Sequence, residues 1–196
     1  ADVKIQVPRV YAEDYIDTTL NICKEQHIDV LISLNDLELP ILADRKRDFE
    51  DIGTKLIVSD PKVIDVCFDK YKTAQFIASL GLKTPKTYVN YDEAVVAIKS
   101  GLLKFPLIVK PRWGSGSIGL EFVDDLEELE MVYKLNRKKV MKSILSTASV
   151  EDDFLLIQEV IKGPEYGLDI VNDLNGHYRG VSVNQKLSMR SGETDK

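Results

Sequence analysis

A glycine- and serine-rich segment that follows a short apolar run constrains this chain more than any other feature. Residues 105–120 read Phe-Pro-Leu-Ile-Val-Lys-Pro-Arg-Trp-Gly-Ser-Gly-Ser-Ile-Gly-Leu. Residues 106–109 are apolar, as in a buried strand, and Lys110 is the first charge after them. Glycine lets the backbone turn sharply and approach a ligand, and successive N–H groups in such a loop can bind an anion. The segment therefore predicts a phosphate-binding loop with a lysine beside it.

The glycine spacing fits several phosphate-loop patterns, and the surrounding residues distinguish between them. Gly114-x-Gly116-x-x-Gly119 fits the dinucleotide fingerprint, but residues 120–123 alternate like a second strand where that fold needs a helix. A Walker loop would need a lysine where this chain has a leucine. A kinase loop would need its lysine downstream, whereas Lys110 lies upstream. A strand, a loop and a returning strand remain, although an ordinary Gly/Ser hairpin turn fits the loop alone equally well.

Composition limits the classes of protein that this chain can be. With 196 residues and 44% hydrophobic composition, it can form one domain or two small ones. The net charge of −6, with acids and bases along the whole length, argues against a nucleic-acid partner. No apolar run approaches a membrane span. Cys23 and Cys67 lie in apolar helical contexts and predict buried free thiols, hence a cytoplasmic location.

The first 68 residues alternate between strand-like and helix-like patterns. We expect strands at 3–7, 30–34 and 55–59, and helices at 12–26, 35–50 and from 61 onward. This alternation predicts a parallel sheet with covered faces, whose ligands sit at the carboxyl ends of the strands. Asp36 and Glu38 fall at such an end, although helix capping also explains both acids.

The remaining residues predict a helix, a linker and a series of hairpins. Helices are expected at 69–80, 91–99 and from a cap at Asp124 to about residue 142, with a linker at 84–87. Strands are expected at 106–109, 120–123 and 154–160, and a hairpin pairs 165–171 with 178–185 through Asn175-Gly176. His27 and His177 have no metal-ligating neighbours in sequence, so no zinc site is indicated.

Four separated motifs resemble the ATP-grasp superfamily. They are Asp69-Lys70 before a helix ending in Gly81-Leu82-x-x-Pro85, the segment 105–120, Gln-Glu-Val-Ile-Lys-Gly-Pro-Glu-Tyr at 158–166, and Arg-Ser-Gly-Glu-Thr at 190–194. The chain is most similar to single-module proteins like the carbamoyl-phosphate synthase large subunit, with biotin carboxylase as a more distant relative.

The resemblance implies a mixed α/β (α+β) fold. It implies a partial parallel-sheet, Rossmann-like lobe at 1–68, followed by an ATP-grasp domain at 69–196. Within that domain, a lid subdomain of about 85–158 would precede the start of a C-terminal subdomain at 159–196. Because the chain begins inside a strand-like run and ends after a Gly-Glu-Thr turn, we expect it to be truncated at both ends.

The resemblance also implies roles for individual residues. Lys70 and Lys110 match the two lysines that hold the ATP phosphates, and residues 158–161 match the strand whose backbone reads adenine. Lys186 and Arg190 would lie near the γ-phosphate and the acyl phosphate. The full set of implied ATP-binding residues is Lys70, Lys110, Gly114, Ser115, Gly116, Ser117, Gly119, Gln158, Glu159, Val160, Ile161 and Glu165. Trp113 departs from the small residue expected there.

The implied activity is that of an ATP- and Mg²⁺-dependent ligase. A carboxylate or bicarbonate would be phosphorylated and then attacked by an amine, both being small molecules. The magnesium ligands are expected beyond Lys196, so the fragment alone should be nearly inactive, and a homodimer is compatible with the resemblance. Two other readings stay open: a nucleotide-binding module without catalysis, and a Rossmann dehydrogenase, which the residues around Gly119 argue against.

Overall fold

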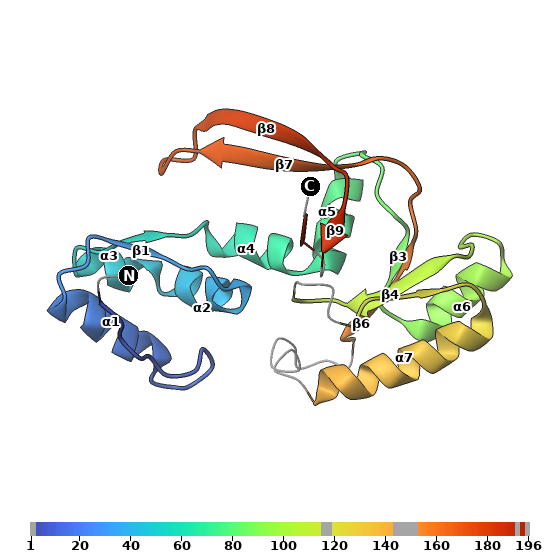
Figure 1. The fold of residues 1–196 in the computed structure, drawn as a ribbon, viewed down its shortest axis with the longest axis horizontal. Helices are drawn as coiled ribbons and strands as arrows, with labels where there is room; N and C mark the ends of the chain where they lie inside the picture. The colour runs from blue at the N-terminus through green and yellow to red at the C-terminus, as the bar shows by residue number, and fades with distance from the viewer. Residues whose placement is uncertain (1–2, 115–118, 143–152, 191–192, 195–196) are drawn as a thin grey trace. The chain divides into compact units, whose positions relative to one another are not determined.

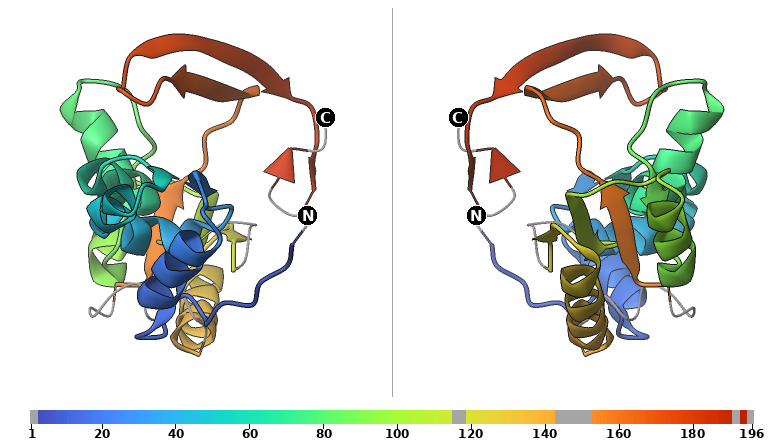
Figure 2. Two further views of the ribbon diagram at one scale, coloured as in Figure 1. Left: turned by 90° about the vertical axis from the view of Figure 1, so that its left-hand side faces the viewer. Right: turned by 90° about the vertical axis from the view of Figure 1, so that its right-hand side faces the viewer.

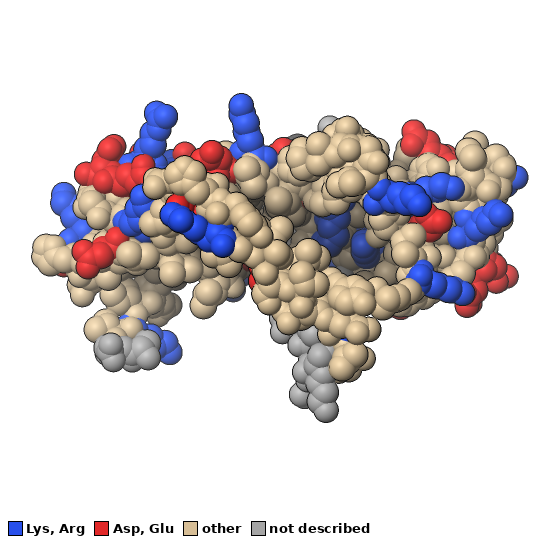
Figure 3. All heavy atoms as spheres, turned by 90° about the horizontal axis from the view of Figure 1, so that it is seen from above, with Lys and Arg blue, Asp and Glu red and all other residues tan. Residues whose placement is uncertain are grey.

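The structure is a computed structural model that describes residues 3–114, 119–142, 153–190 and 193–194. The chain divides into two compact units, Ala1–Phe68 and Asp69–Lys196 (Figure 1). The described residues contain no helix that is long and apolar enough to cross a membrane. Basic and acidic side chains are interspersed on the face drawn in Figure 3.

The first unit alternates helices with a pair of parallel strands. Its elements are α1 (Tyr15–Glu25), β1 (Val30–Ile32), the 3-10 helix η1 (Asp36–Glu38), α2 (Leu39–Asp44), α3 (Lys46–Asp51), β2 (Lys55–Ile57) and α4 (Pro61–Phe68). Strands β1 and β2 pair in parallel, with Leu31 opposite Leu56. The predicted parallel pairing is therefore confirmed.

Three expectations for the first unit are corrected. Residues 3–7 form no strand, because they pair with no other strand among the described residues. The single helix expected over 35–50 is three elements, since Arg45 has non-helical dihedrals (φ −108°, ψ 15°) between α2 and α3. Cys67 is exposed, whereas Cys23 is buried.

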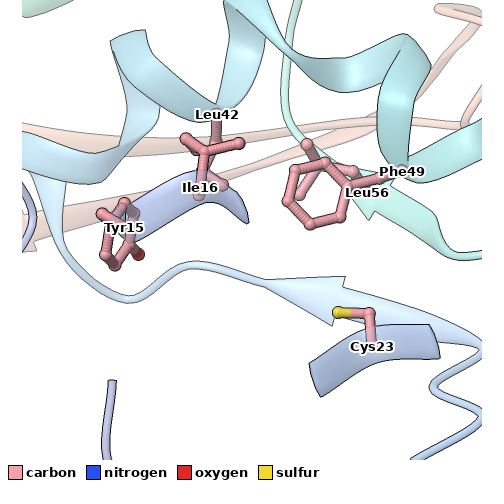
Figure 4. Packing of buried hydrophobic residues seen from close by; sticks show 6 residues of the cluster. All are labelled: Tyr15, Ile16, Cys23, Leu42, Phe49 and Leu56. Atoms are coloured by element: carbon pink, nitrogen blue, oxygen red, sulfur yellow. The ribbon is translucent and has the colours of Figure 1, made fainter. Parts of the chain in front are cut away.

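One hydrophobic cluster holds the first unit together. Figure 4 shows Tyr15, Ile16 and Cys23 from α1 with Leu42 of α2, Phe49 of α3 and Leu56 of β2. These side chains are at most 7% exposed, and Phe49 is fully buried. Burial of apolar side chains at this level is the main stabilising contribution to a unit of this size.

The second unit is built around a four-stranded sheet. Its elements are α5 (Lys70–Ser79), β3 (Thr87–Tyr88), α6 (Tyr91–Lys99), β4 (Leu107–Pro111), β5 (Glu121–Val123), α7 (Leu126–Met141), β6 (Leu155–Glu159), β7 (Glu165–Asn172), β8 (Tyr178–Lys186), β9 (Met189–Arg190) and β10 (Glu193–Thr194). The sheet order is β3-β6-β4-β5, and every neighbouring pair is antiparallel. The predicted pairing of β4 with the strand after the glycine loop is confirmed.

Helices α6 and α7 cover one face of this sheet. Helix α7 packs along β4, β5 and β6, and α6 packs against β3 (Figures 1 and 2). The two helices meet where the rings of Tyr91 and Tyr133 lie 5.0 Å apart. Along β4, Leu107 and Val109 are fully buried, while Ile108 and Lys110 are half-buried on the opposite face. Lys110 therefore lies on the face away from the helices.

Two further expectations are corrected in this unit. The predicted linker at 84–87 ends in the short edge strand β3, whose Thr87 lies opposite Gln158. Helix α7 is capped by Asp125 rather than by Asp124, since the Asp125 carboxylate accepts a hydrogen bond from the Glu128 N–H. The neighbouring Asp124 N–H instead donates to the Glu128 side chain.

Strands β7 and β8 form the predicted long hairpin. They pair from Glu165 opposite Lys186 to Asn172 opposite Tyr178, and the Gly176 N–H donates to Asp173 O in the turn. Gly176 has a φ of +80°, the left-handed conformation that an Asn-Gly turn requires. Strand residues from Tyr166 to Val183 are mostly exposed.

Candidate functional site

The centre of the candidate site is a lysine at the end of β4. The Nζ of Lys110 donates a hydrogen bond to Oε1 of Gln158 in β6, at 2.7 Å. Burial lowers the pKa of Lys110 from its ordinary value, because a desolvated ammonium is less stable than a hydrated one. Among the described residues no carboxylate lies within ion-pair distance of this Nζ. Lys110 is thus a half-buried cation with a neutral partner.

The amide of Gln158 is held in turn by the edge strand. Its Nε2 donates to Thr87 Oγ1 at 2.7 Å, and the Thr87 hydroxyl donates to the carbonyl of Pro85 at 2.9 Å. Thr87 lies directly opposite Gln158, which lies directly opposite Ile108. The pairing of β3, β6 and β4 therefore brings Thr87, Gln158 and Lys110 onto one face of the sheet.

The second lysine comes from the start of α5. The carboxylate of Asp69 caps this helix by accepting from the Tyr71 and Lys72 N–H groups, at 2.9 and 3.3 Å. Lys70 follows this cap, and its N–H donates to the carbonyl of Arg112 at 3.2 Å. Its Nζ donates to the carbonyl of Gly114 at 2.5 Å, with Arg112 O at 3.4 Å. The helix start thus presents Lys70 to the first residues of the glycine loop.

The two lysines approach the same end of β4. Lys70 contacts the carbonyl of Arg112, which directly follows the last residue of β4 and is two residues beyond Lys110 in sequence. The structure thereby brings Lys70, Lys110, Gly114 and Gln158 into one neighbourhood.

An arginine that the sequence did not single out ties these segments together. Arg112 binds Asp69 through two nitrogens, at 2.9 Å (Nε to Oδ1) and 2.8 Å (Nη2 to Oδ2), and its Nη1 also binds Asp153. Its side chain is only 11% exposed, and its guanidinium lies over the rings of Tyr71 and Trp113, at 5.4 and 4.8 Å. Trp113, which fitted no sequence pattern, therefore forms one side of the arginine's pocket.

The glycine loop is fixed at its far end by helix α7. Gly114 and Gly119 have φ values of +87° and +69°, a conformation that favours glycine. The carbonyl of Gly119 accepts a hydrogen bond from Nδ2 of Asn136 at 2.8 Å. The predicted ligands Ser115, Gly116 and Ser117 lie outside the described residues.

The predicted adenine-reading segment spans the end of β6. Strand β6 ends at Glu159, so Val160 and Ile161 follow it, and Ile161 is 65% exposed. The Glu159 N–H donates to the Lys86 carbonyl at 2.9 Å, and a carboxylate oxygen of Glu159 accepts from the Lys86 N–H at 3.3 Å. Val160 and Ile161 themselves lie in no strand.

The remaining predicted residues belong to the hairpin and the strand after it. Glu165 and Lys186 pair with each other across β7 and β8, with Oε1 and Nζ 2.7 Å apart. Arg190 lies in β9, and its side chain is outside the described residues. The Glu165–Lys186 pair is internal to the hairpin and does not by itself connect these residues to the other lysines.

The residues that the structure describes supply no cluster of three or more metal-ligating side chains. Near the lysines, the carboxylates of Asp69 and Asp153 are both bound by Arg112. These described residues therefore do not fit a magnesium ion.

Arg112 and Asn136, like Thr87, are site residues that the sequence did not reveal. Their partners lie 43, 41 and 17 residues away in sequence, so no local spacing pattern could have indicated them. The one available signal was an arginine and a tryptophan inserted directly before a glycine-rich loop.

Two family models match separate parts of this chain. Residues 103–195 match the ATP-grasp domain, and residues 1–57 match the N-terminal domain of PylC-like proteins. The ATP-grasp match includes Lys110, the glycine loop, Gln158 and the hairpin. It therefore covers most of the neighbourhood described above.

Curated relatives cover only part of this chain. D-alanine–D-alanine ligase of Stutzerimonas stutzeri is 33% identical over 107 residues, which are 55% of this chain and 30% of that protein. The carbamoyl phosphate synthase large chain of Campylobacter jejuni is 35% identical over 81 residues, which are 40% of this chain and 7% of that protein. The chain thus matches under a third of the length of these relatives.

Solved structures share the fold over nearly the whole chain. The biotin carboxylase domain of Hydrogenobacter thermophilus 2-oxoglutarate carboxylase, in complex with MgADP, ADP and bicarbonate, has a TM-score of 0.71 at 18% identity. That match covers 97% of this chain and 41% of the other. L-amino acid ligase from Bacillus licheniformis has a TM-score of 0.63 at 22% identity, covering 93% and 39%. Residues 103–195 of this chain therefore match the ATP-grasp domain; the chain resembles the carbamoyl phosphate synthase large chain in part of its sequence and biotin carboxylase in its mixed α/β fold.

Proposed function

We propose that this protein binds ATP and uses it to join a carboxylate, or bicarbonate, to an amine. The observation that carries the proposal is Lys110, a half-buried ammonium whose described partner is the neutral amide of Gln158. A desolvated cation without a counter-charge is a favourable place for an anionic ligand. Lys70 and the two positive-φ glycines at the ends of the loop support a ligand with several phosphates.

The proposed ligand contacts follow the roles that the resemblance to the ATP-grasp family implies for each residue. Lys110 and Lys70 would neutralise phosphates from two sides, and the glycine–serine loop would supply N–H donors. The backbone from Gln158 to Ile161 would face the adenine, Glu159 would lie on the adenosine side, and Glu165 would accept from the ribose hydroxyls. Lys186 and Arg190 would stabilise charge at the γ-phosphate and the acyl phosphate.

The proposed reaction has two steps. A carboxylate oxygen attacks the γ-phosphorus of ATP, the bond from that phosphorus to the bridging oxygen breaks, and ADP leaves with the electron pair. An amine nitrogen then attacks the acyl carbon, the bond to the phosphate oxygen breaks, and the nitrogen loses a proton to give an amide and phosphate. Because no protein nucleophile is needed, fixed positive charge and positioning carry the catalysis.

The similar proteins suggest the substrate class without fixing the substrate. Ligases of D-alanine and of L-amino acids, and carbamoyl phosphate synthase, are among the proteins that this chain resembles. We therefore propose that the acid is either an amino acid or bicarbonate, and that the amine is either a second amino acid or ammonia.

Release of ADP tests this proposal. The intact protein would be incubated with ATP, magnesium and pairs of acids and amines, with single substrates as controls. We expect ADP release only when an acid and an amine are both present. The matched variants are Lys110→Met, which should abolish it, and Lys104→Met, which removes an exposed lysine. ATP binding without substrate-dependent ADP release would instead favour a non-catalytic nucleotide-binding module.

A further inference from the structure

Three consecutive hydrogen bonds run across three strands on the lysine-bearing face of the sheet. Lys110 Nζ donates to Gln158 Oε1 at 2.7 Å, Gln158 Nε2 donates to Thr87 Oγ1 at 2.7 Å, and Thr87 Oγ1 donates to the Pro85 carbonyl at 2.9 Å. All four groups belong to the second unit. They form one continuous chain of donors and acceptors from an edge strand to the candidate phosphate-binding lysine.

The direction of this chain is fixed by the number of protons available. A threonine hydroxyl has one proton, and Thr87 gives it to the Pro85 carbonyl, which can only accept. Towards Gln158, Thr87 can therefore only accept, so the NH₂ group of the amide faces Thr87. The carbonyl oxygen of the amide then faces Lys110, where an ammonium requires an acceptor.

Whether the partner of Lys110 is charged or neutral affects how strongly an anionic ligand can bind. A carboxylate at position 158 would hold the ammonium equally well, but it would neutralise the lysine and repel a phosphate. Gln158 has the same shape without the charge. The nearby carboxylates of Asp69 and Asp153 are bound by Arg112 instead, and Glu159 accepts from the Lys86 N–H.

We propose that Thr87 and Gln158 are positioning residues that hold the Lys110 ammonium in place through a neutral acceptor, leaving its full charge available to a phosphate. This inference rests on the proposed ATP binding at Lys110. It assigns to the Gln158 side chain a role separate from any contact of its backbone with adenine, and to Thr87 a role that its place on an edge strand did not suggest.

Binding of MgATP, measured by calorimetry on the intact protein, tests the inference. Gln158→Glu should weaken binding at least about tenfold, the scale of a charged hydrogen bond in a desolvated site, whereas Gln75→Glu adds the same charge at an exposed position of α5 and should not. Thr87→Val should also weaken binding, because the amide loses the acceptor that orients it, and Thr87→Ser should restore binding relative to Thr87→Val.

A double-mutant cycle separates positioning from a general loss of structure. In the Lys110→Met background, Thr87→Val should have a much smaller effect on MgATP affinity, while thermal unfolding reports whether each variant is folded. Equal MgATP affinity for wild type and a folded Gln158→Glu, or a Thr87→Val effect that persists without Lys110, would overturn the inference while leaving the proposed function standing. No MgATP binding by the wild-type protein would overturn both.

Discussion

Asn136, in the middle of helix α7, donates a hydrogen bond to the carbonyl of Gly119 at 2.8 Å, although it is only 1% exposed. The bond joins the helix that covers the sheet to the residue at which the glycine loop returns to β5. The other amide atom of Asn136, Oδ1, is buried and has no hydrogen-bond partner among the described residues. A buried acceptor without a partner destabilises the folded state, and the hydrogen bond from Nδ2 to the Gly119 carbonyl offsets part of that cost.

Substitutions at Asn136 should therefore reduce stability in a defined order. Asn136→Ala leaves the Gly119 carbonyl without its donor and should lower the free energy of unfolding by about 1–3 kcal/mol. Asn136→Asp keeps the shape but buries a charge next to a carbonyl oxygen, and should cost more. Urea denaturation measures both. Equal stability of wild type and Asn136→Asp would contradict this assignment.

Gly119 itself should resist a side chain for two separable reasons. It has a φ of +69°, and a Cβ atom would lie 3.3 Å from Cγ of Pro111. Gly101 has a similar φ of +74° with nothing within 4 Å of an added Cβ. Gly101→Ala should thus report the backbone cost alone, about 1 kcal/mol, and Gly119→Ala should cost more by the contact with Pro111. Equal unfolding free energies for the two variants would show that the contact is unimportant.

Arg112 should not be replaceable by lysine. Its fork binds both oxygens of Asp69 and reaches Asp153, and a single ammonium cannot reproduce that geometry. Arg112→Lys should lower the free energy of unfolding by about 1–3 kcal/mol. Arg112→Met, which leaves two carboxylates unpaired, should cost about 3–5 kcal/mol. Lys138→Met, at an exposed position of α7, serves as the control. An Arg112→Met variant with the same free energy of unfolding as wild type would exclude a structural role for the ion pairs of Arg112 with Asp69 and Asp153.

Lys110 should give the protein a pH dependence that ordinary lysines do not. Burial lowers its pKa below the ordinary 10.5. In the pH window between that lowered pKa and 10.5, the unfolded state binds the proton and the folded state does not. The contribution of Lys110 to the free energy of unfolding should therefore rise with pH across this window. Affinity for MgATP should fall over the same window, because the lysine loses its charge. Titration of affinity from neutral to alkaline pH checks this, and an unchanged affinity would contradict the role of the ammonium.

Local sequence signals predicted the elements well. Helix α6 runs from Tyr91 to Lys99 as expected, because Asn90 caps it through the Glu93 N–H. Asp69 caps α5, and the Asn-Gly turn joins β7 to β8. Each of these features depends on residues within a few positions of one another, so the sequence contains the information needed.

Contacts between distant residues could not be predicted in the same way. Nothing in the sequence indicated that β6 lies between β3 and β4, or that Thr87 would face Gln158. The glycine loop and Lys110 were identified from composition and order. The partner of Lys110 depends on strand register, which follows from packing of the whole sheet rather than from a local pattern.

Affinity for MgATP in two matched lysine variants tests the central claim most directly. Lys110 is half-buried beside a neutral amide, and Lys104 is exposed six residues earlier. Loss of a charged hydrogen bond should weaken binding by about 1.5–3 kcal/mol or more, so Lys110→Met should bind MgATP at least about tenfold more weakly than wild type. Lys104→Met should bind like wild type. Undiminished binding by a folded Lys110→Met variant would contradict the account.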